Sequence, residues 1–143
     1  MLRKLTVTSA TWAMLPLRLA LGVIFIAHGA QKVFGSWEGP GLRAFINFPA
    51  PYSFMRPAWL WMGAAAIAEL LGGVLVLLGL FTRVGAFLIF CVMLTAMLGV
   101  HWSKGFFMSS MGIEYSLALV GMALALLIAG GGQASADKMI SRR

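Results

Sequence analysis

Residues 62–80 read MGAAAIAELLGGVLVLLGL, an apolar run interrupted by a single charged residue, Glu69. Its length is close to the roughly 20 residues that an α-helix needs to cross the hydrocarbon core of a bilayer. In lipid the backbone polar groups must be satisfied within the segment, so such a run forms a helix. The stretch therefore predicts a transmembrane helix with one carboxyl group near its middle.

The rest of the chain has the same apolar character. Of its 143 residues, 61% are hydrophobic and 10% are charged, and the mean hydropathy is +0.93. Ordinary soluble domains contain about 25% charged residues, and a soluble domain of this size cannot bury so much apolar surface. The net charge is +7, but the basic residues stand at the ends of apolar runs and form no nucleic-acid-binding stripe. The composition indicates an integral membrane protein.

Four apolar runs suit transmembrane helices: 12–34, 59–80, 84–102 and 112–130. Gly79 is expected to stop the second helix and Thr82 to cap the third. In the long loop 35–58, the helical spacing of Leu42, Phe45 and Ile46 predicts a short interfacial helix, although an irregular loop also accounts for so brief a pattern. We therefore expect an all-α fold, a transmembrane four-helix bundle that forms a single integral membrane domain over residues 1–143.

The distribution of lysine and arginine predicts the orientation in the membrane. With four spans, both termini lie on the same side. That side carries more basic residues, so both termini are expected to be cytoplasmic and the loop 35–58 periplasmic. The predicted cytoplasmic side carries Arg3, Lys4, Arg83, Lys138, Arg142 and Arg143. The opposite side carries Lys32, Arg43, Arg56 and Lys104.

Six residues of the first predicted helix fall within one wedge of roughly 120°. An ionisable side chain at the centre of a span costs about 2.5–3.5 kcal/mol, so a shared wedge favours a polar seam that faces the bundle. Alternatively, the two cations snorkel to opposite surfaces and the histidine is an isolated interfacial residue. The wedge contains Arg18, Gly22, Phe25, His28, Gly29 and Lys32.

Glu69 lies too deep in its span for so short a side chain to reach the surface. We expect it to be buried, either protonated or paired, with Arg18 and His28 as the nearest cationic candidates. In the alternative interpretation, a salt bridge between Glu69 and Arg18 is purely structural. The helix face of Glu69 also carries small residues that favour close packing against another helix: Ala65, Ala66, Gly72 and Gly73.

His101 and Glu114 are predicted to face each other across the turn between the third and fourth helices. Glu114 shares a helix face with small residues, which predicts a second packing surface at Ala118, Gly121 and Ala125. An alternative role for Glu114 is to stabilise the positive end of its helix dipole. His101 is alternatively an ordinary interfacial histidine.

Depths estimated along the helices place three titratable residues in one layer near the outer face. At 1.5 Å per residue, His28, His101 and Glu114 all lie about 22–26 Å from the cytoplasmic ends of their helices. Glu69 lies roughly 16 Å and Arg18 about 8 Å from those ends. We interpret this arrangement as a funnel that leads from the outer interface to the middle of the membrane.

Two kinds of site fit such a layer. Two histidines and a carboxylate are possible metal ligands, but no HxxxH or ExxH spacing supports a metal site. Histidine and glutamate also hydrogen-bond quinone carbonyls and move protons. No haem, flavin or nicotinamide motif is present. Cys91 is the chain's single cysteine, which excludes dithiol chemistry within the chain, and it is interpreted as a packing residue.

Several motifs together resemble the DoxX family of small bacterial membrane proteins. They are LRL followed by HGxxK, AELxGG, the turn LGLFTR, and the glutamate that opens the last helix; the resemblance extends from about Leu15 to Asp137. The family pattern falls on Arg18, His28, Lys32, Glu69, Arg83, His101 and Glu114.

The resemblance implies an inner-membrane subunit of a quinone-linked oxidoreductase system that acts on thiols or thiosulfate, or in oxidative stress. On this hypothesis His28, His101, Glu114 and Glu69 are catalytic candidates, and Arg18, Lys32, His28 and His101 are candidates for binding the quinone. Membrane lipid, a partner protein or further copies of the chain are the expected partners. Two alternatives are a non-enzymatic membrane anchor or assembly factor, and a small transporter or proton path.

Overall fold

A computed structural model describes residues 6–141 of the chain. Within that range the structure is all-helical. Helix α5 continues through a π-helical segment, Met97–His101, and a 3-10 turn, Trp102–Lys104. The long helices are α2 (Met14–Phe34), α4 (Ala58–Leu78), α5 (Thr82–Ala96) and α6 (Glu114–Ala129), and the short ones are α3 (Gly41–Phe45), α7 (Ala136–Ser141) and the 3-10 turns Ser36–Glu38 and Met108–Ser110.

The predicted all-helical membrane fold is confirmed. Among the described residues, three helices are long and apolar enough to cross a membrane: α2, α4, and α5 together with its continuation to Lys104. Helix α6 is also apolar but has only 16 residues, so its crossing of the membrane stays a prediction. The short helix expected within the loop 35–58 is confirmed as α3.

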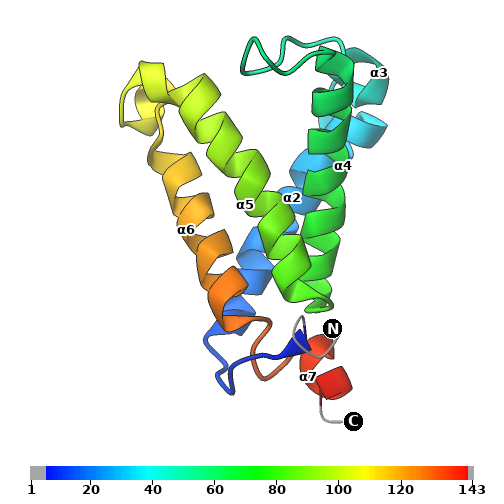
Figure 1. Cartoon of the computed structure of the whole chain (residues 1–143), viewed down its shortest axis with the longest axis vertical. Helices are drawn as coiled ribbons and strands as arrows, with labels where there is room; N and C mark the ends of the chain where they lie inside the picture. The colour runs from blue at the N-terminus through cyan, green and yellow to red at the C-terminus, as the bar shows by residue number, and fades with distance from the viewer. Residues whose placement is uncertain (1–5, 142–143) are drawn as a thin grey trace.

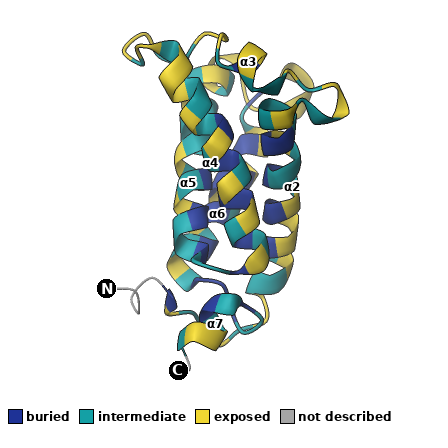
Figure 2. Ribbon diagram, turned by 90° about the vertical axis from the view of Figure 1, so that its right-hand side faces the viewer, coloured by how far each residue is buried: buried dark blue, intermediate teal, exposed yellow. Residues whose placement is uncertain are grey.

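The four long helices pack side by side. Helices α4 and α5 meet at the turn Gly79–Thr82 and diverge toward the opposite end of the molecule, where α3 lies (Figure 1). Helix α6 packs against α5 and α2 (Figure 2). We call the two ends of the molecule the α7 end and the α3 end. Many large apolar residues of the helices are exposed, as expected of helices surrounded by lipid.

Glycines set the register of α2 against α4. A Cβ on Gly29 would lie 2.6 Å from the backbone of Leu70, and one on Gly22 would lie 2.8 Å from Cβ of Leu77. Gly73 approaches α2 in the same way from the α4 side, because its Cβ would lie 2.7 Å from the Ile26 nitrogen. The prediction that the small-residue face of Glu69's helix packs inward is therefore confirmed.

The corresponding prediction for α6 is wrong. A Cβ on Gly121 would meet nothing within 4 Å, and Ala118 is exposed. Helix α6 instead packs through a neighbouring face, where Leu119, Ala123 and Leu126 join the hydrophobic core. These larger side chains fill the space toward α5 and α2, whereas the small residues would leave it empty.

Arg18 ties the α7 end together. Its guanidinium donates to the carbonyls of Val76 at 2.9 Å and Leu77 at 2.8 Å, which are among the last of α4. It also donates to the carbonyls of Gly131 at 3.1 Å and Ala134 at 2.5 Å. The last carbonyls of a helix lack partners within the helix and carry partial negative charge, so a buried cation stabilises them. Arg18 therefore has a structural position at the end of α4.

Asp137 caps α5 from far along the chain. Its carboxylate accepts hydrogen bonds from the backbone nitrogens of Phe81 at 2.7 Å and Thr82 at 2.8 Å. The prediction that Thr82 caps this helix is therefore wrong, because its hydroxyl is buried with no partner among the described residues. Gly79 ends α4 in the left-handed conformation with φ of 68°, as expected.

Four residues of the orientation prediction, Arg3, Lys4, Arg142 and Arg143, lie outside the described residues.

Replacement of Gly29 by alanine is expected to destabilise the protein by about 1–3 kcal/mol, because the added methyl group overpacks the contact with α4. The matched control is Gly121→Ala, which adds a methyl group in open space within a helix and should not destabilise the fold. Unfolding in detergent, followed by circular dichroism, measures both. Equal stability of the two variants would contradict the register described here.

Candidate functional site

A cavity of about 270 Å³ lies between α2, α5 and α6 toward the α3 end. We call it the inner cavity. Its walls include Phe25 and Leu119, together with the thioethers of Met93, Met108 and Met111. The polar and ionisable residues that line it come from four helices: His28, Lys32, Glu69, His101, Tyr115 and Ser116.

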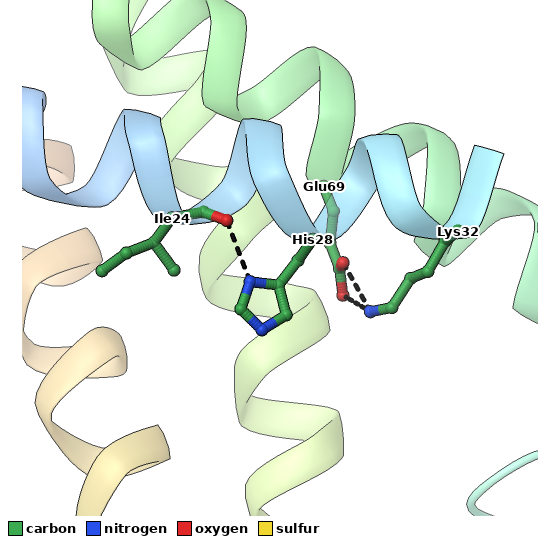
Figure 3. Close-up of polar contacts among 4 residues, drawn as sticks. All are labelled: Ile24, His28, Lys32 and Glu69. Atoms are coloured by element: carbon green, nitrogen blue, oxygen red, sulfur yellow. Dashed lines mark hydrogen bonds and ion pairs between the residues drawn. The ribbon is translucent and has the colours of Figure 1, made fainter. Parts of the chain in front are cut away.

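An ion pair between α2 and α4 forms one wall of this cavity. The Lys32 ammonium lies 2.5 Å from both carboxylate oxygens of Glu69 (Figure 3). The Glu69 side chain is 5% exposed and that of Lys32 is 23% exposed. The ammonium also lies 5.2 Å from the centre of the Phe45 ring, in cation–π geometry. The carboxylate is thus deeply buried with its charge balanced, and the lysine side chain reaches it from nearer the α3 end.

The predicted pairing of Glu69 with Arg18 or His28 is wrong. Because Gly29 lies against Leu70 and Gly22 against Leu77, the register places Glu69 beside the C-terminal half of α2, far from Arg18. Lys32 lies about one turn beyond Gly29, and its long, flexible side chain extends back to the carboxylate. The depths estimated from the helical rise did not predict this pairing, because they take no account of the length of the lysine side chain.

A second cavity of about 410 Å³ lies between α4 and α5. We call it the outer cavity. Its lining is mostly apolar, with Ala64 and Ala68 on α4 facing Cys91 and Thr95 on α5. The two cavities share four residues. The ion pair and the imidazole of His101 therefore stand between the two spaces: the shared residues are Lys32, Glu69, Ala96 and His101.

Both histidines are oriented by backbone carbonyls. Nδ1 of His28 lies 3.0 Å from the Ile24 carbonyl (Figure 3), and Nδ1 of His101 lies 2.7 Å from the Met111 carbonyl. A carbonyl only accepts hydrogen bonds, so Nδ1 carries the proton in both rings. Nε2 is then the nitrogen that gains or loses a proton, and it has no partner in either ring among residues 6–141.

A change in helix winding positions His101. Helix α5 is π-helical over Met97–His101, and each residue added to a turn rotates the following side chains by roughly 100°. Such wide turns occur frequently at functional sites. Gly99 within this segment lets the loop pack closely, because a Cβ there would lie 2.8 Å from Cβ of Pro51.

The structure brings four of the six sequence-predicted site residues together: His28, Lys32, Glu69 and His101 line the inner cavity. Glu114 does not line either cavity, because its carboxylate accepts a hydrogen bond of 2.8 Å from the backbone nitrogen of Met108 and so folds over the preceding loop. Arg18 lies at the other end of α2. The predicted layer of His28, His101 and Glu114 is thus only partly formed.

Several lining residues were missed by sequence reasoning. The sequence does not identify the three methionines of the inner cavity as lining residues, because methionine is equally common in ordinary packing. Cys91 was predicted to be a packing residue, which is wrong, since it is exposed and lines the outer cavity. Among the described residues no group of three His, Cys, Asp or Glu side chains is arranged to hold a metal ion.

Comparison with known proteins gives a family match over most of the chain. The family model described as DoxX matches residues 13–102. The uncharacterized membrane protein Rv3486 of Mycobacterium tuberculosis is 29% identical, over 89% of this chain and 80% of its own length. "Putative oxidoreductase CatD" of Bacillus subtilis is 36% identical, over 77% of this chain and 75% of its own length. No solved structure matches.

Replacement of Lys32 by methionine is expected to destabilise the protein by about 3–5 kcal/mol, because it leaves the buried Glu69 carboxylate without a partner. The double variant Lys32→Met/Glu69→Gln removes both charges and should recover most of this loss. Thermal unfolding in detergent measures both, with the exposed Lys104→Met as the matched control. If Lys32→Met were as stable as Lys104→Met, the ion pair would not hold α2 to α4.

Proposed function

The chain belongs to the DoxX family of membrane proteins, and from that membership and the divided cavity we propose that it binds the ring of a membrane quinone. The inner cavity is the binding site, and the protein is the quinone-binding subunit of a membrane oxidoreductase. The observation that supports this most is that two histidines, whose Nε2 atoms have no partner among residues 6–141, line one largely apolar cavity together with a buried ion pair.

The inner cavity suits a quinone ring in polarity and in size. A quinone presents a flat apolar ring with a carbonyl acceptor on each of two opposite sides. Methionine thioethers and aromatic and aliphatic side chains suit the ring faces, and protonated Nε2 atoms suit the carbonyls. Small-molecule sites have volumes of roughly 300–1,000 Å³ and combine apolar walls with a few placed polar groups. The inner cavity, at about 270 Å³, is slightly smaller than this range, and the outer cavity, at about 410 Å³, falls within it.

The two histidines would hold and move the protons of the reaction. A quinone takes up two electrons and two protons when it is reduced to the quinol. A protonated Nε2 would donate its proton to the quinone oxygen and take another from water. With Nδ1 fixed on a carbonyl, only the proton on Nε2 is exchanged. Lys32 and Glu69 keep a balanced pair of charges beside the ring.

The electron donor must come from outside this chain, because one cysteine cannot form an internal disulfide. Two thiols that join in a disulfide release two electrons and two protons, which balances the reduction of one quinone. Two thiosulfate ions that join through a sulfur–sulfur bond release two electrons, and water then supplies both protons. The donor class proposed is therefore a thiol or thiosulfate, delivered directly or through a partner protein. The word "oxidoreductase" in the printed name of the Bacillus subtilis relative agrees with this class.

The proposed location is the bacterial inner membrane with the α7 end in the cytoplasm. Arg83 and Lys138 lie at the α7 end, and the sequence carries further basic residues near its two termini, Arg3, Lys4, Arg142 and Arg143. Basic residues are enriched in cytoplasmic segments. The inner cavity, toward the α3 end, then lies nearer the periplasmic surface.

Purified protein in lipid nanodiscs is expected to bind tetramethyl-benzoquinone, and quinone should co-purify from native membranes. His101→Phe removes one charge-assisted hydrogen bond, so the affinity should fall by about 10- to 100-fold. Quenching of tryptophan fluorescence measures the affinity, and organic extraction with chromatography measures the bound quinone. Lys104→Met, a change at the same end of the molecule that touches neither cavity, is the control. Wild-type protein that binds no quinone would refute the proposal and favour a non-enzymatic anchor.

A further inference from the structure

The outer cavity is bounded at both of its ends along α4 and α5. At the α7 end α4 and α5 close together, because a Cβ on Gly72 would lie 3.0 Å from the Gly85 carbonyl oxygen. At the α3 end the loop residues Pro51 and Met55 cover it. One side is open at the outer face of α4 and α5, where Cys91 and other lining residues are exposed. This open side faces the surroundings that lipid would occupy.

Polarity changes along the outer cavity in one direction. Its ionisable residues, Lys32, Glu69 and His101, lie at the inner end, where they are shared with the inner cavity. The walls toward the outer face are short or apolar, with Ala64 and Ala68 opposite Cys91. A molecule that fits both cavities therefore has a polar head and an apolar chain. The small residues on α4 leave room for that chain between the helices.

We propose that the cleft between α4 and α5 is a lateral entrance from the bilayer, and that it holds the hydrocarbon tail of the ligand whose ring occupies the inner cavity. This inference rests on the proposed function, because the tail is that of a membrane quinone. The ring enters past Cys91, passes beside the Lys32–Glu69 pair where the two cavities share lining residues, and stops beside the histidines. The tail remains in the outer cavity and continues into lipid.

The entrance gives the small residues of α4 a role in selecting the ligand. The substitution Ala68→Phe would fill the space between α4 and α5 that the tail occupies, while the inner cavity, which Ala68 does not line, would keep its shape. The affinity for a tailed quinone should then fall, and the affinity for a ring without a tail should not. No purely structural role of Ala68 predicts such a difference between two ligands.

Cys91 reports directly on occupation of the entrance, because it is the chain's single cysteine and it lines the outer cavity. In nanodiscs, a fully substituted benzoquinone with a decyl tail is expected to slow alkylation of Cys91 by a maleimide. Full substitution of the ring prevents addition of the thiol to the quinone. At about ten times its dissociation constant the tailed quinone should slow the reaction by roughly tenfold, because only unoccupied protein reacts. Tetramethyl-benzoquinone, which has no tail, should slow it less than about twofold.

The variant Ala68→Phe is expected to weaken binding of the decyl quinone by about tenfold, the effect of roughly two methylene groups losing their contacts. Its affinity for tetramethyl-benzoquinone should stay within about twofold of wild type. Ala64→Phe, at a more exposed position on the same wall, repeats the test should Ala68→Phe fold poorly. Ala118→Phe, on the exposed face of α6 away from both cavities, is the matched control.

The two proposals fail in different ways. If wild-type protein binds both quinones but Cys91 stays unprotected and Ala68→Phe binds the decyl quinone normally, the lateral entrance is refuted and the quinone site stands. If wild-type protein binds neither quinone, the proposed function itself is refuted, and the entrance with it. Protection of Cys91 by the decyl quinone alone, lost in Ala68→Phe, supports both.

Discussion

A buried carboxylate in the middle of an apolar helix needs a partner, and the ion pair between Lys32 and Glu69 meets that requirement. Leaving either charge unpaired in such surroundings costs several kcal/mol. The pair joins α2 to α4 beside the outer cavity, which lies between α4 and α5. The helices can therefore diverge and leave two cavities without loss of the contact between α2 and α4. The same pair forms the boundary between those cavities.

The geometry of the pair depends on residues that carry no charge. Gly22, Gly29 and Gly73 let α2 and α4 approach so closely that added Cβ atoms would collide with the facing helix. Their spacing fixes the antiparallel register, and the register brings Lys32 within reach of Glu69. At the α7 end, the guanidinium of Arg18 holds the last carbonyls of α4. The α3 end is then the part of the molecule where the helices stand apart and side chains surround open space.

Much of the architecture follows from local sequence properties. The length and polarity of the apolar runs predict the helices, and Gly79 correctly predicts where α4 ends. Pairing between distant residues was harder to predict. Depth estimates from backbone rise placed Glu69 nearer to Arg18 and His28 than to Lys32, but such estimates ignore the reach of the lysine side chain. The cap supplied by Asp137 had no local signal, because it comes from 55 residues along the chain.

The candidate site likewise contains some residues that the sequence predicts and others that it does not. His28 and His101 were predicted to lie near each other, and both line the inner cavity. The methionines and the π-helical segment that place His101 were not predicted, because methionine is common in ordinary cores and a π-turn has no simple periodicity. Glu114 shares the depth of the histidines, but a hydrogen bond to Met108 turns its carboxylate away from the cavity. Equal depth along helices is thus necessary for a shared site and does not by itself create one.

The proposed function depends most on a quinone ring held by hydrogen bonds beside the ion pair. Infrared difference spectroscopy of the protein in nanodiscs, with quinone labelled by ¹³C at its carbonyl carbons, measures those bonds directly. A strong hydrogen bond from a protonated imidazole or ammonium group weakens the carbonyl bond. At least one labelled carbonyl band is therefore expected at lower frequency than in protein-free lipid. Carbonyl bands that stay at their positions in protein-free lipid would contradict the account.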